Sequence, residues 1–496
     1  MYVKELLERQ KENSKIAITQ GDMKISYKDW YDLSKNLSKE IETYLIPDSS
    51  NVAIFLPNSI NYAIAYFAIT FINRTIVPIG IQAKELEVCS TARYCELDMF
   101  ITVSSLASSL VDFFKNYEYK VEIFCIDNKQ WIVVNEDKQF INKTEMEILT
   151  EKSTAIMLHT SGSTSLPKRV MLTHYGLIHN IESNIDSLKL TENDVCLISI
   201  PMFFGYCNTA QFLTHIYLGA SMVIMTGVFY PKEFFKVIEK KKVTNYTGVP
   251  SNLLMLLQYR YAYKYDYSSL RYICFGGGIM PMDGLKELIE RFPTIGFVQT
   301  YGQTEASPRL TVILPEFMQS KIGSVGKPIK DVKIRVVDET YKDCKKNEVG
   351  EIIASGPNVM KGYYKNEEAT KQTIIDGWLH TGDLGYLDDD DFLYIVGRKK
   401  NIIISGGINI YPEEIEEVLL MNPCVKDVIV YGEPDYILGE VPVADIVYNE
   451  GEREDLSAYC MGKLAKYKVP VQFYIKEKIE KTYNGKIKRK YSKKGE

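Results

Sequence analysis

Short runs of β-branched and other apolar residues alternate with segments of helical pattern over much of the chain, and this alternation constrains the fold most. The runs that we expect to form buried strands are NVAIFLP (51–57), TIVPIG (75–80), TAIMLHT (154–160), DVCLISIP (194–201), SMVIMTG (221–227) and YICFGGG (272–278). Helical patterns lie between some of these runs, in INYAIAYFAITFINR (60–74) and PKEFFKVIEKKK (231–242). Strands that alternate with helices indicate parallel sheets covered by helices, so the sequence predicts an α/β fold.

The pattern changes near residue 325, where two short strand pairs with polar turns follow one another in GKPIKDVKIRVVDETYKDCKKNEVGEIIASG (326–356). Such pairs are typical of a small antiparallel sheet. A compact pattern of helix, strand, strand and helix then occupies the segments PEEIEEVLLMNP, VKDVIVYG, VPVADIVYN and DLSAYCMGKLAKYK (455–468). This second pattern predicts a separate α+β domain.

A chain of 496 residues exceeds what one hydrophobic core usually holds, so more than one domain is expected. We predict a large N-terminal domain, residues 1–397, made of parallel α/β sheets plus a small antiparallel β subdomain. A small α+β C-terminal domain, residues 398–496, is expected to follow it.

Composition excludes several classes of partner. The formal net charge is -5, which gives no global electrostatic support for binding nucleic acid. No apolar stretch reaches the length that spans a bilayer, so we expect no membrane span, and the N-terminal residues do not resemble a signal peptide. The nine cysteines form no CxxC pair and no cluster with metal-ligand spacing. We therefore expect buried thiols in a cytoplasmic, reducing compartment.

One loop concentrates hydroxyl groups in LHTSGSTSLPKRVMLTH (158–174). Thr160, Ser161, Ser163 and Thr164 flank a glycine, and Lys168 follows them. A strand that ends in a loop rich in hydroxyls and backbone N–H groups, with one lysine, is suited to phosphate oxygens. The loop is not a Walker sequence, because GxxxxGK[ST] occurs nowhere in the chain.

Four further segments carry chemistry of the same kind. In TYGQTEASP (300–308) an aromatic face beside a carboxylate is suited to stacking a base and holding a hard cation. In GWLHTGDLG (377–385) Asp383 is suited to accepting hydrogen bonds from a ribose diol. The other two segments are GRKKNIIISGGINIYPEEIE (397–416), with Arg398 and a glycine pair, and YNGKIKRK (483–490), with Lys486.

Taken together and in this order, the motifs TSGSTSLPK, YGQTE, TGD and GRKKN…SGGINIYPEEIE resemble those of the adenylate-forming superfamily. That superfamily comprises acyl- and aryl-CoA synthetases, peptide-synthetase adenylation domains and luciferases, and the resemblance covers essentially the whole chain. It implies two half-reactions with ATP and Mg²⁺. A carboxylate attacks the α-phosphorus of ATP to give an acyl-adenylate and pyrophosphate, and a thiol then displaces AMP to give a thioester.

The resemblance also implies roles for individual residues. The β- and γ-phosphates would be handled by Thr160, Ser161, Gly162, Ser163, Thr164 and Lys168. Adenine would lie between Gly276, Gly277 and Gly278 on one face and Tyr301, followed by Gly302 and Gln303, on the other. Thr304 would contact the α-phosphate, and Glu305 would hold the metal ion. Asp383 and Arg398 would contact the ribose. Lys486 would bridge the carboxylate and the α-phosphate, and Lys400 would be the hinge of a mobile C-terminal domain.

The chain departs from the family pattern in the phosphate loop. Ser165 and Arg169 stand where the family usually has glycine, and this puts the phosphate geometry in doubt. A degenerate nucleotide-binding or scaffold protein is the alternative that these two residues favour. The presence of Glu305, Asp383 and Lys486 together argues against it.

The segment PMFFGYCNTAQF (201–212) resembles the segment that lines the acid pocket of the family, which implies that Phe203, Phe204 and Gly205 contact the acid. Amino-acid-activating relatives often have an aspartate at the position of Phe204, where it pairs with the α-ammonium group. An uncharged fatty or aryl acid is therefore favoured. A stand-alone amino-acid ligase that loads a carrier protein stays open, as does the choice between CoA and a carrier protein, acting in trans, as thiol acceptor.

Overall fold

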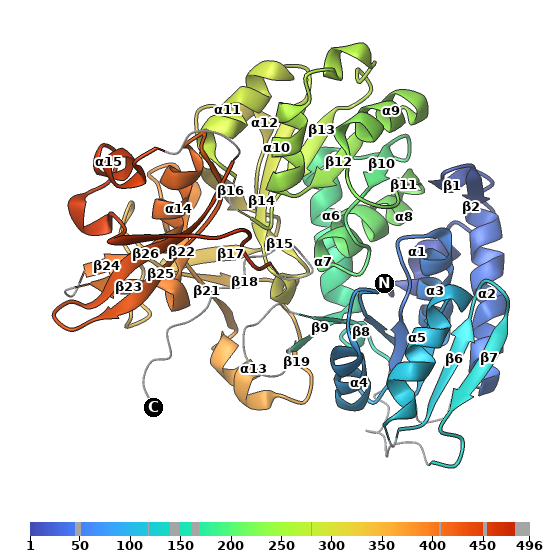
Figure 1. Ribbon diagram of the computed structural model, residues 1–496. Helices are drawn as coiled ribbons and strands as arrows, with labels where there is room; N and C mark the ends of the chain where they lie inside the picture. Colours follow the sequence, from blue (N-terminus) through green and yellow to red (C-terminus); the bar gives the residue numbers. More distant parts are fainter. Residues whose placement is uncertain are drawn as a thin grey trace.

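The computed structural model describes residues 1–44, 51–117, 119–138, 148–159, 168–278, 280–405, 408–449 and 454–481. Within these residues the strands form sheets of 14, 8 and 5 strands (Figure 1). Most strands expected from the sequence are present, each shortened to its apolar centre. Among the described residues, no helix is both long and apolar enough to cross a membrane.

The eight-stranded sheet contains the segments on both sides of the predicted phosphate loop. Its spatial order is β19 (Gly362–Tyr363), β9 (Arg169–Thr173), β8 (Thr154–His159), β4 (Thr75–Pro78), β3 (Asn51–Ile54), β5 (Met99–Thr102), β6 (Val121–Cys125) and β7 (Gln130–Val134). The helices of this region are α1 (Lys4–Glu8), α2 (Tyr27–Tyr44), α3 (Ile60–Phe71), α4 (Glu85–Tyr94) and α5 (Ser104–Lys115). Strands β8 and β9 are antiparallel and pair His159 with Arg169, so the two ends of the phosphate loop are adjacent.

The largest sheet has a parallel half that carries the adenine-motif glycines at one strand end. The parallel strands of this half are β1 (Ile16–Gln20), β11 (Ser221–Ile224), β10 (Val195–Ile198), β12 (Asn245–Gly248), β13 (Tyr272–Phe275) and β14 (Gly296–Gly302). Strand β2 (Met23–Ser26) is antiparallel to β1 at the edge of the sheet. The chain here also forms α6 (His174–Leu188), α7 (Gly205–Cys207), α8 (Thr214–Leu218), α9 (Pro231–Lys241), α10 (Pro250–Gln258), α11 (Met282–Arg291) and α12 (Pro315–Met318). A π-helical turn, Asn208–Leu213, separates α7 from α8.

The predicted antiparallel subdomain is not a separate sheet, because its strands continue the parallel half through β14. They are β15 (Arg309–Ile313), β16 (Ser324–Pro328), β22 (Leu393–Arg398), β21 (Trp378–Leu387), β20 (Ile374–Ile375), β18 (Gly350–Ser355) and β17 (Lys333–Val337). The short helix α13 (Glu367–Thr373) precedes β20. The antiparallel pairing of β14 with β15 joins the two halves, so Tyr301 on β14 and Asp383 on β21 belong to one continuous sheet.

Helix boundaries follow local chemistry. Ser59 caps α3, since its side chain accepts a hydrogen bond from the backbone of Tyr62 at 3.1 Å. Almost every residue of α3 is buried, which explains its uniformly apolar sequence.

The expected helix 455–468 was wrong in extent. Helix α15 (Leu456–Met461) ends at Gly462, a residue with low helix propensity, and only a short 3₁₀ turn, Lys466–Lys468, follows.

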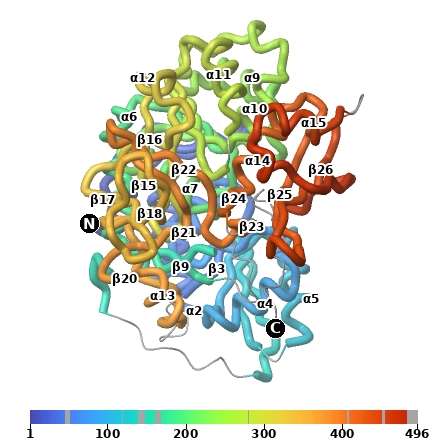
Figure 2. Tube along the Cα trace, turned by 90° about the vertical axis from the view of Figure 1, so that its left-hand side faces the viewer, coloured from blue at the N-terminus to red at the C-terminus, as the bar shows by residue number. Residues whose placement is uncertain are grey.

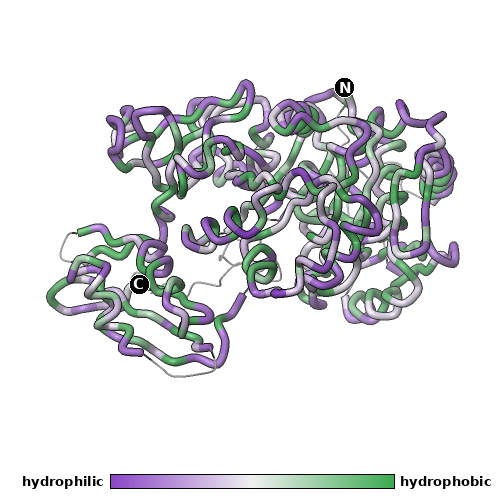
Figure 3. Tube along the Cα trace, turned by 90° about the horizontal axis from the view of Figure 1, so that it is seen from above, coloured by the Kyte–Doolittle hydropathy of each residue, from purple (hydrophilic) through white to green (hydrophobic). Residues whose placement is uncertain are grey.

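The C-terminal elements have a core of their own. The five-stranded sheet comprises β23 (Ile403–Ser405), β24 (Ile408–Ile410), β25 (Val425–Asp435), β26 (Gly439–Tyr448) and β27 (Gln472–Ile475). Helix α14 (Pro412–Leu420) packs on it, and Ile410, Ile415 and Leu419 are fully buried there. Figure 3 shows this lobe set apart from the rest of the chain. Figure 2 shows α14 and α15 on the side of the molecule where α10 and α11 lie. The carboxylate of Asp283, on α11, is close enough to that of Glu417, on α14, to interact with it electrostatically.

Candidate active site

A cavity of about 860 Å³ opens where β8, β9, β13, β14 and β22 end. It brings together residues that are widely separated in the sequence. The sequence-predicted residues that line it are Lys168, Phe203, Phe204, Gly205, Gly276, Gly277, Tyr301, Gly302, Gln303, Thr304, Glu305, Arg398 and Lys400. The cavity therefore coincides with the site that the motifs predict.

The other predicted residues lie behind the wall or outside the described residues. Gly278 directly follows the lining pair Gly276–Gly277, and Asp383 is 4% exposed beneath Tyr301 and Arg398. The phosphate-loop residues Thr160, Ser161, Gly162, Ser163, Thr164 and Ser165 lie outside the described residues, as do Gly406, Gly407 and Lys486.

Asp383 is the centre of a buried polar group at one end of the cavity. Tyr301 donates its hydroxyl proton to Asp383 Oδ2 at 2.7 Å, and Arg398 Nε donates to Asp383 Oδ1 at the same distance. The carboxylate raises the pKa of Arg398, and burial raises that of Tyr301 well above its ordinary value. Each carboxylate oxygen keeps a second lone pair, so Asp383 is held in place and still has capacity to accept from a diol.

The glycine segment beside Tyr301 offers bare backbone. A Cβ atom at Gly276 would lie 2.4 Å from the carbonyl oxygen of Thr300, a distance that no side chain tolerates. Gly277 has a φ of +79°, in the left-handed region that favours glycine, and open space where a Cβ would be. A flat ligand such as a base can therefore approach the main chain here.

Glu305 is positioned by a residue that sequence reasoning missed. The hydroxyl of Tyr363, on β19, donates to Glu305 Oε1 at 2.9 Å, and Lys168 Nζ lies 4.6 Å from the centre of the same tyrosine ring. Burial and the Glu305 carboxylate raise the pKa of Tyr363, so its hydroxyl stays protonated and donates. One aromatic ring thus contacts both the predicted phosphate-loop lysine and the predicted metal ligand.

The donor set fits a magnesium ion held mainly by phosphates. In the described part of the chain, no cluster of three or more His, Cys, Asp or Glu residues is arranged to hold a metal, and this includes the turn Asp388–Asp391. Glu305 Oε2 accepts no hydrogen bond from the described residues, so one hard oxygen of the carboxylate is available. Mg²⁺ commonly binds through one or two carboxylates plus substrate phosphates, and Glu305 provides one such ligand.

Arg169, one of the two departures from the family pattern, is buried against a neighbouring helix. Its side chain is 2% exposed, and Nη2 donates to Thr91 Oγ1 on α4 at 2.5 Å. Burial, with the charge of Arg169, lowers the pKa of the neighbouring His159 to about 3, so this imidazole in the cavity wall is neutral. Arg169 therefore anchors the start of β9 to α4.

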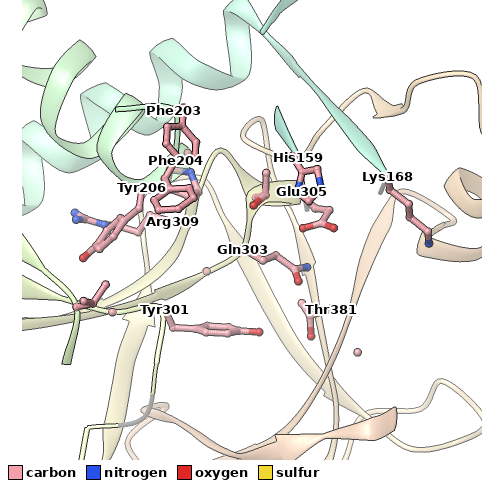
Figure 4. Close-up of a pocket in the computed structure, with 18 of the residues that line it drawn as sticks. His159, Lys168, Phe203, Phe204, Tyr206, Tyr301, Gln303, Glu305, Arg309 and Thr381 are labelled. Carbon is pink, nitrogen blue, oxygen red and sulfur yellow. The ribbon is translucent and has the colours of Figure 1, made fainter. Parts of the chain in front are cut away.

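Aromatic side chains form the opposite end of the cavity (Figure 4). The rings of Phe203 and Phe204 lie 4.4 Å apart, and both line the cavity while packing on the core. Gly80 leaves room for the tip of the Phe203 ring, because a Cβ there would lie 2.8 Å from Cζ of that ring. The π-helical turn that follows them is a geometry frequent at functional sites. This end is suited to an apolar or aromatic acid.

Three further wall residues at this end, Tyr206, Thr300 and Arg309, were not predicted as contacts. Tyr206 Oη and Thr300 Oγ1 are 2.7 Å apart, and burial raises the pKa of Tyr206 to about 12. Arg309 lies beside Tyr206 (Figure 4). The motif YGQTEASP ends one residue before Arg309, and nothing in the sequence pattern distinguishes this arginine from a surface residue.

The residues around Lys400 are fixed on both sides. Arg398 is paired with Asp383, and Lys399 Nζ lies 2.9 Å from Glu351 Oε2, so both are tied to the antiparallel strands. On the other side, Asn401 donates to Glu413 Oε1 on α14 at 2.6 Å. Lys400 thus lies at the junction between the large sheet and the C-terminal lobe.

Known proteins resemble the chain over nearly its whole length. A family model described as AMP-binding enzyme matches residues 7–364, and one described as AMP-binding enzyme C-terminal domain matches residues 414–486. The chain is 31% identical to a 2-succinylbenzoate–CoA ligase of Bacillus subtilis, an alignment that covers 97% of this chain and 96% of that protein.

A second relative from the same organism, a long-chain-fatty-acid–CoA ligase, is 32% identical, with 96% of this chain and 91% of that protein covered. Among solved structures, the o-succinylbenzoate coenzyme A synthetase of Bacillus subtilis in complex with ATP and magnesium ion matches with a TM-score of 0.86 at 29% identity. That match covers 97% of this chain and 98% of the other.

Proposed function

The chain belongs to the AMP-binding enzyme family, and on this basis we propose that it activates an aryl carboxylic acid and transfers the acyl group to CoA. The general reaction is that of an AMP-forming acid–thiol ligase. The acid and ATP give an acyl-adenylate and pyrophosphate, and a thiol then displaces AMP to give a thioester. One observation carries the proposal: a single cavity joins the Tyr301–Asp383–Arg398 group and Glu305 to a wall of aromatic side chains.

The nucleotide would occupy the end of the cavity near Asp383. Adenine would lie against the backbone of Gly276 and Gly277, and the ribose hydroxyls would donate to Asp383, which Tyr301 and Arg398 already hold. This arrangement binds the nucleoside without requiring a side chain to reorient, because the carboxylate is fixed before the ligand arrives.

The phosphates would lie between Lys168 and Glu305, near the predicted phosphate loop. Glu305 would hold the Mg²⁺ ion, which neutralises phosphate charge when bound. Thr304 would donate to the α-phosphate, and Lys486 would bridge this phosphate and the carboxylate of the acid. The first half-reaction brings two anions together, so these groups act by neutralising charge and aligning the reacting atoms.

The aromatic end of the cavity favours an aryl acid. Phe203 and Phe204 present ring faces and edges, and aromatic groups gain from offset or edge-to-face contacts beyond the area that they bury. Relatives named for 2-succinylbenzoate and for long-chain fatty acids are about equally similar to the chain, so the rings of the wall are the reason to prefer the aryl class.

An amino-acid substrate fits the wall less well. The charged side chain beside Tyr206 is Arg309, a cation, and a cation opposes the α-ammonium group of an amino acid. CoA is the proposed thiol because the relatives are named as CoA ligases. A carrier protein in trans is the alternative acceptor.

We further propose that residues 398–496 act as a lid over residues 1–397. Lys400 is the proposed hinge, because its neighbours are tied to opposite sides of the junction. The nine cysteines, all unpaired thiols and most of them buried, support a cytoplasmic, reducing location.

Pyrophosphate exchange into ATP tests the proposal, with panels of aryl, fatty and amino acids and no thiol present. We expect exchange with aryl acids, and thioester formation when CoA is added. Exchange with amino acids alone would overturn the acid class, and no exchange with any acid would overturn the activity.

A further inference from the structure

One surface of the large domain combines exposed tyrosines with basic side chains. Between α10 and β13, the segment YRYAYKYDY (259–267) has tyrosine at every second position. Tyr261 and Tyr263 are 53% and 75% exposed, so their rings contribute little to the core. Arg260 and Lys264, which adjoin them in the sequence, are also exposed. The segment therefore presents aromatic and cationic groups to its surroundings.

Helix α9, in the upper right of Figure 1, presents a row of lysines beside this segment. Lys232, Lys236 and Lys240 follow one another at intervals of four residues, so they lie on one side of the helix, and all three are exposed. The buried residues of α9 are Phe234, Phe235 and Ile238. The helix thus turns an apolar side to the core and a basic side to the solvent.

Contacts between α9 and the segment 259–267 make the two one surface. The backbone N–H of Asp266 donates to Glu239 Oε1 at 2.9 Å, and Lys242 Nζ lies 2.7 Å from Asp266 Oδ2. The ring of Phe235 packs against three tyrosines of the segment, Tyr259, Tyr265 and Tyr267. These contacts fix the exposed tyrosines next to the lysines. We define the α9 surface by six exposed residues, Lys236, Lys240, Arg260, Tyr261, Tyr263 and Lys264.

The α9 surface is positively charged on a negatively charged protein. Residues 231–267 contain seven Lys or Arg and three Asp or Glu, a net charge of +4, whereas the whole chain has -5. All three acids are engaged by neighbouring groups. In the part of the chain that the structure describes, Lys240, Arg260 and Lys264 form no ion pair with a carboxylate. Lys264 Nζ lies 4.8 Å from the centre of the Tyr261 ring, so a cation and an aromatic ring stand side by side.

An anionic bilayer matches this combination of groups. A single exposed tyrosine is normal on a soluble protein, whereas two neighbouring ones among basic residues suit the boundary between lipid headgroups and water. Tyrosine rings and lysine stems are apolar, while the hydroxyl and ammonium groups reach water and phosphate. Single-stranded nucleic acid commonly binds in basic grooves with aromatic residues. The α9 surface is the outer side of a helix and its adjoining segment, which favours the bilayer.

We propose that the α9 surface docks the enzyme reversibly on a lipid bilayer that contains anionic headgroups. Tyr261 and Tyr263 enter the headgroup layer, and the lysines and Arg260 lie over lipid phosphates. This interaction goes beyond the proposed function, because none of the residues of the α9 surface is among those that line the cavity. Docking of this kind needs no membrane-spanning helix.

Sedimentation of the full-length enzyme with vesicles tests the inference, with no substrate present. Vesicles of phosphatidylglycerol and phosphatidylcholine in equal parts are compared with vesicles of phosphatidylcholine alone. We expect binding to the anionic vesicles to be about 100-fold stronger in low salt, since each basic residue near an anionic membrane contributes about fivefold. Binding should be lost at about 1 M salt, where the Debye length falls to about 3 Å.

Paired variants assign the binding to the α9 surface. Lys240→Gln with Lys264→Gln should weaken binding to anionic vesicles by about 10-fold or more. Tyr261→Ser with Tyr263→Ser should also weaken it by about 10-fold, because it removes the apolar area that enters the headgroup layer. The matched control is Tyr341→Ser with Lys342→Gln, since this pair is also exposed but lies on the turn between β17 and β18. The control should bind as the unmodified enzyme does, and all variants should keep their circular dichroism and pyrophosphate exchange.

Several results would overturn the inference. Equal binding to neutral and anionic vesicles would exclude the electrostatic match, and an equal loss in the control variant would place the contact elsewhere. Displacement by soluble glycerol phosphate at the phosphate concentration of the vesicles would indicate a site for one phosphate group instead of a bilayer. Tighter binding to RNA or DNA at equal phosphate concentration would assign the surface to nucleic acid. Because binding is measured without substrate, its failure leaves the proposed function standing.

Discussion

Replacing Tyr363 by phenylalanine removes one oxygen atom from the active-site wall and keeps the ring. The hydroxyl of Tyr363 is the donor to Glu305 Oε1, at 2.9 Å, and Glu305 lines the cavity. The ring also contacts Lys168, and that contact would survive in Tyr363→Phe. The variant therefore isolates the hydrogen bond to the proposed metal ligand.

The expected size of the effect follows from the burial of this bond. Tyr363 is 6% exposed, so water screens the bond little, and hydrogen bonds to charged groups contribute about 1.5–3 kcal/mol. Residues that orient metal ligands typically change metal affinity by about 10- to 100-fold when replaced. We therefore expect the Mg²⁺ concentration for half-maximal pyrophosphate exchange to rise by about 10-fold or more. The KM for the acid should change little, because the hydroxyl that is removed contacts Glu305 and the ring at position 363 is kept.

The chain provides a matched control in the next residue. Tyr364 also donates to a carboxylate at 2.9 Å, Glu96 Oε2, but Glu96 does not line the cavity. Tyr364→Phe should leave the Mg²⁺ dependence unchanged. Binding of Mn²⁺ to the enzyme–ATP complex, followed by electron paramagnetic resonance, gives a readout besides activity. Equal shifts in the two variants, or no shift in Tyr363→Phe, would refute the positioning role of Tyr363.

Three further substitutions test other parts of the site. Lys486→Ala should slow adenylate formation by about 100- to 1000-fold and spare thioester formation from supplied acyl-AMP. Equal losses in both steps would contradict its role. Lys400→Pro should slow the thioester step by about 10-fold or more and spare pyrophosphate exchange, because proline fixes φ at the proposed hinge; a normal second step would exclude the hinge. Phe204→Asp should lower kcat/KM for apolar acids by about 10-fold or more, since it buries an unpaired charge; unchanged selectivity would remove Phe204 from the acid pocket.

Local sequence patterns were sufficient to single out residues that belong to a short motif within one element. Tyr301 lies at the end of a buried strand, and Asp383 lies between two glycines of a short motif, so short-range signals singled out both residues. The glycines suggested a turn around Asp383, whereas the residue lies within β21. The hydrogen bond between Tyr301 and Asp383 was not predictable. It depends on the pairing of strands more than 70 residues apart in sequence, through the continuous sheet that joins β14 to β21.

The positions of Tyr363 and Arg309 in the cavity wall could not be predicted from the sequence. Tyr363 reaches Glu305 only because the two-residue strand β19 pairs with β9, and no motif marks that pairing. Arg309 would be interpreted as a surface residue from any pattern of polarity, whereas its side chain is buried in the cavity wall. In the phosphate loop, the departure at Arg169 suggested altered phosphate geometry, whereas its side chain is engaged with Thr91 on α4.

The central claim is that the carboxylate of the acid attacks the α-phosphorus of ATP. The product in which a carboxylate oxygen of the acid appears tests this claim most directly. An aryl acid labelled with oxygen-18 in its carboxylate is incubated with the enzyme, ATP, Mg²⁺ and CoA, and the products are analysed by mass spectrometry. If the carboxylate attacks the α-phosphorus, AMP carries one labelled oxygen and pyrophosphate carries none. Label in pyrophosphate or inorganic phosphate, or unlabelled AMP formed together with the thioester, would contradict the account.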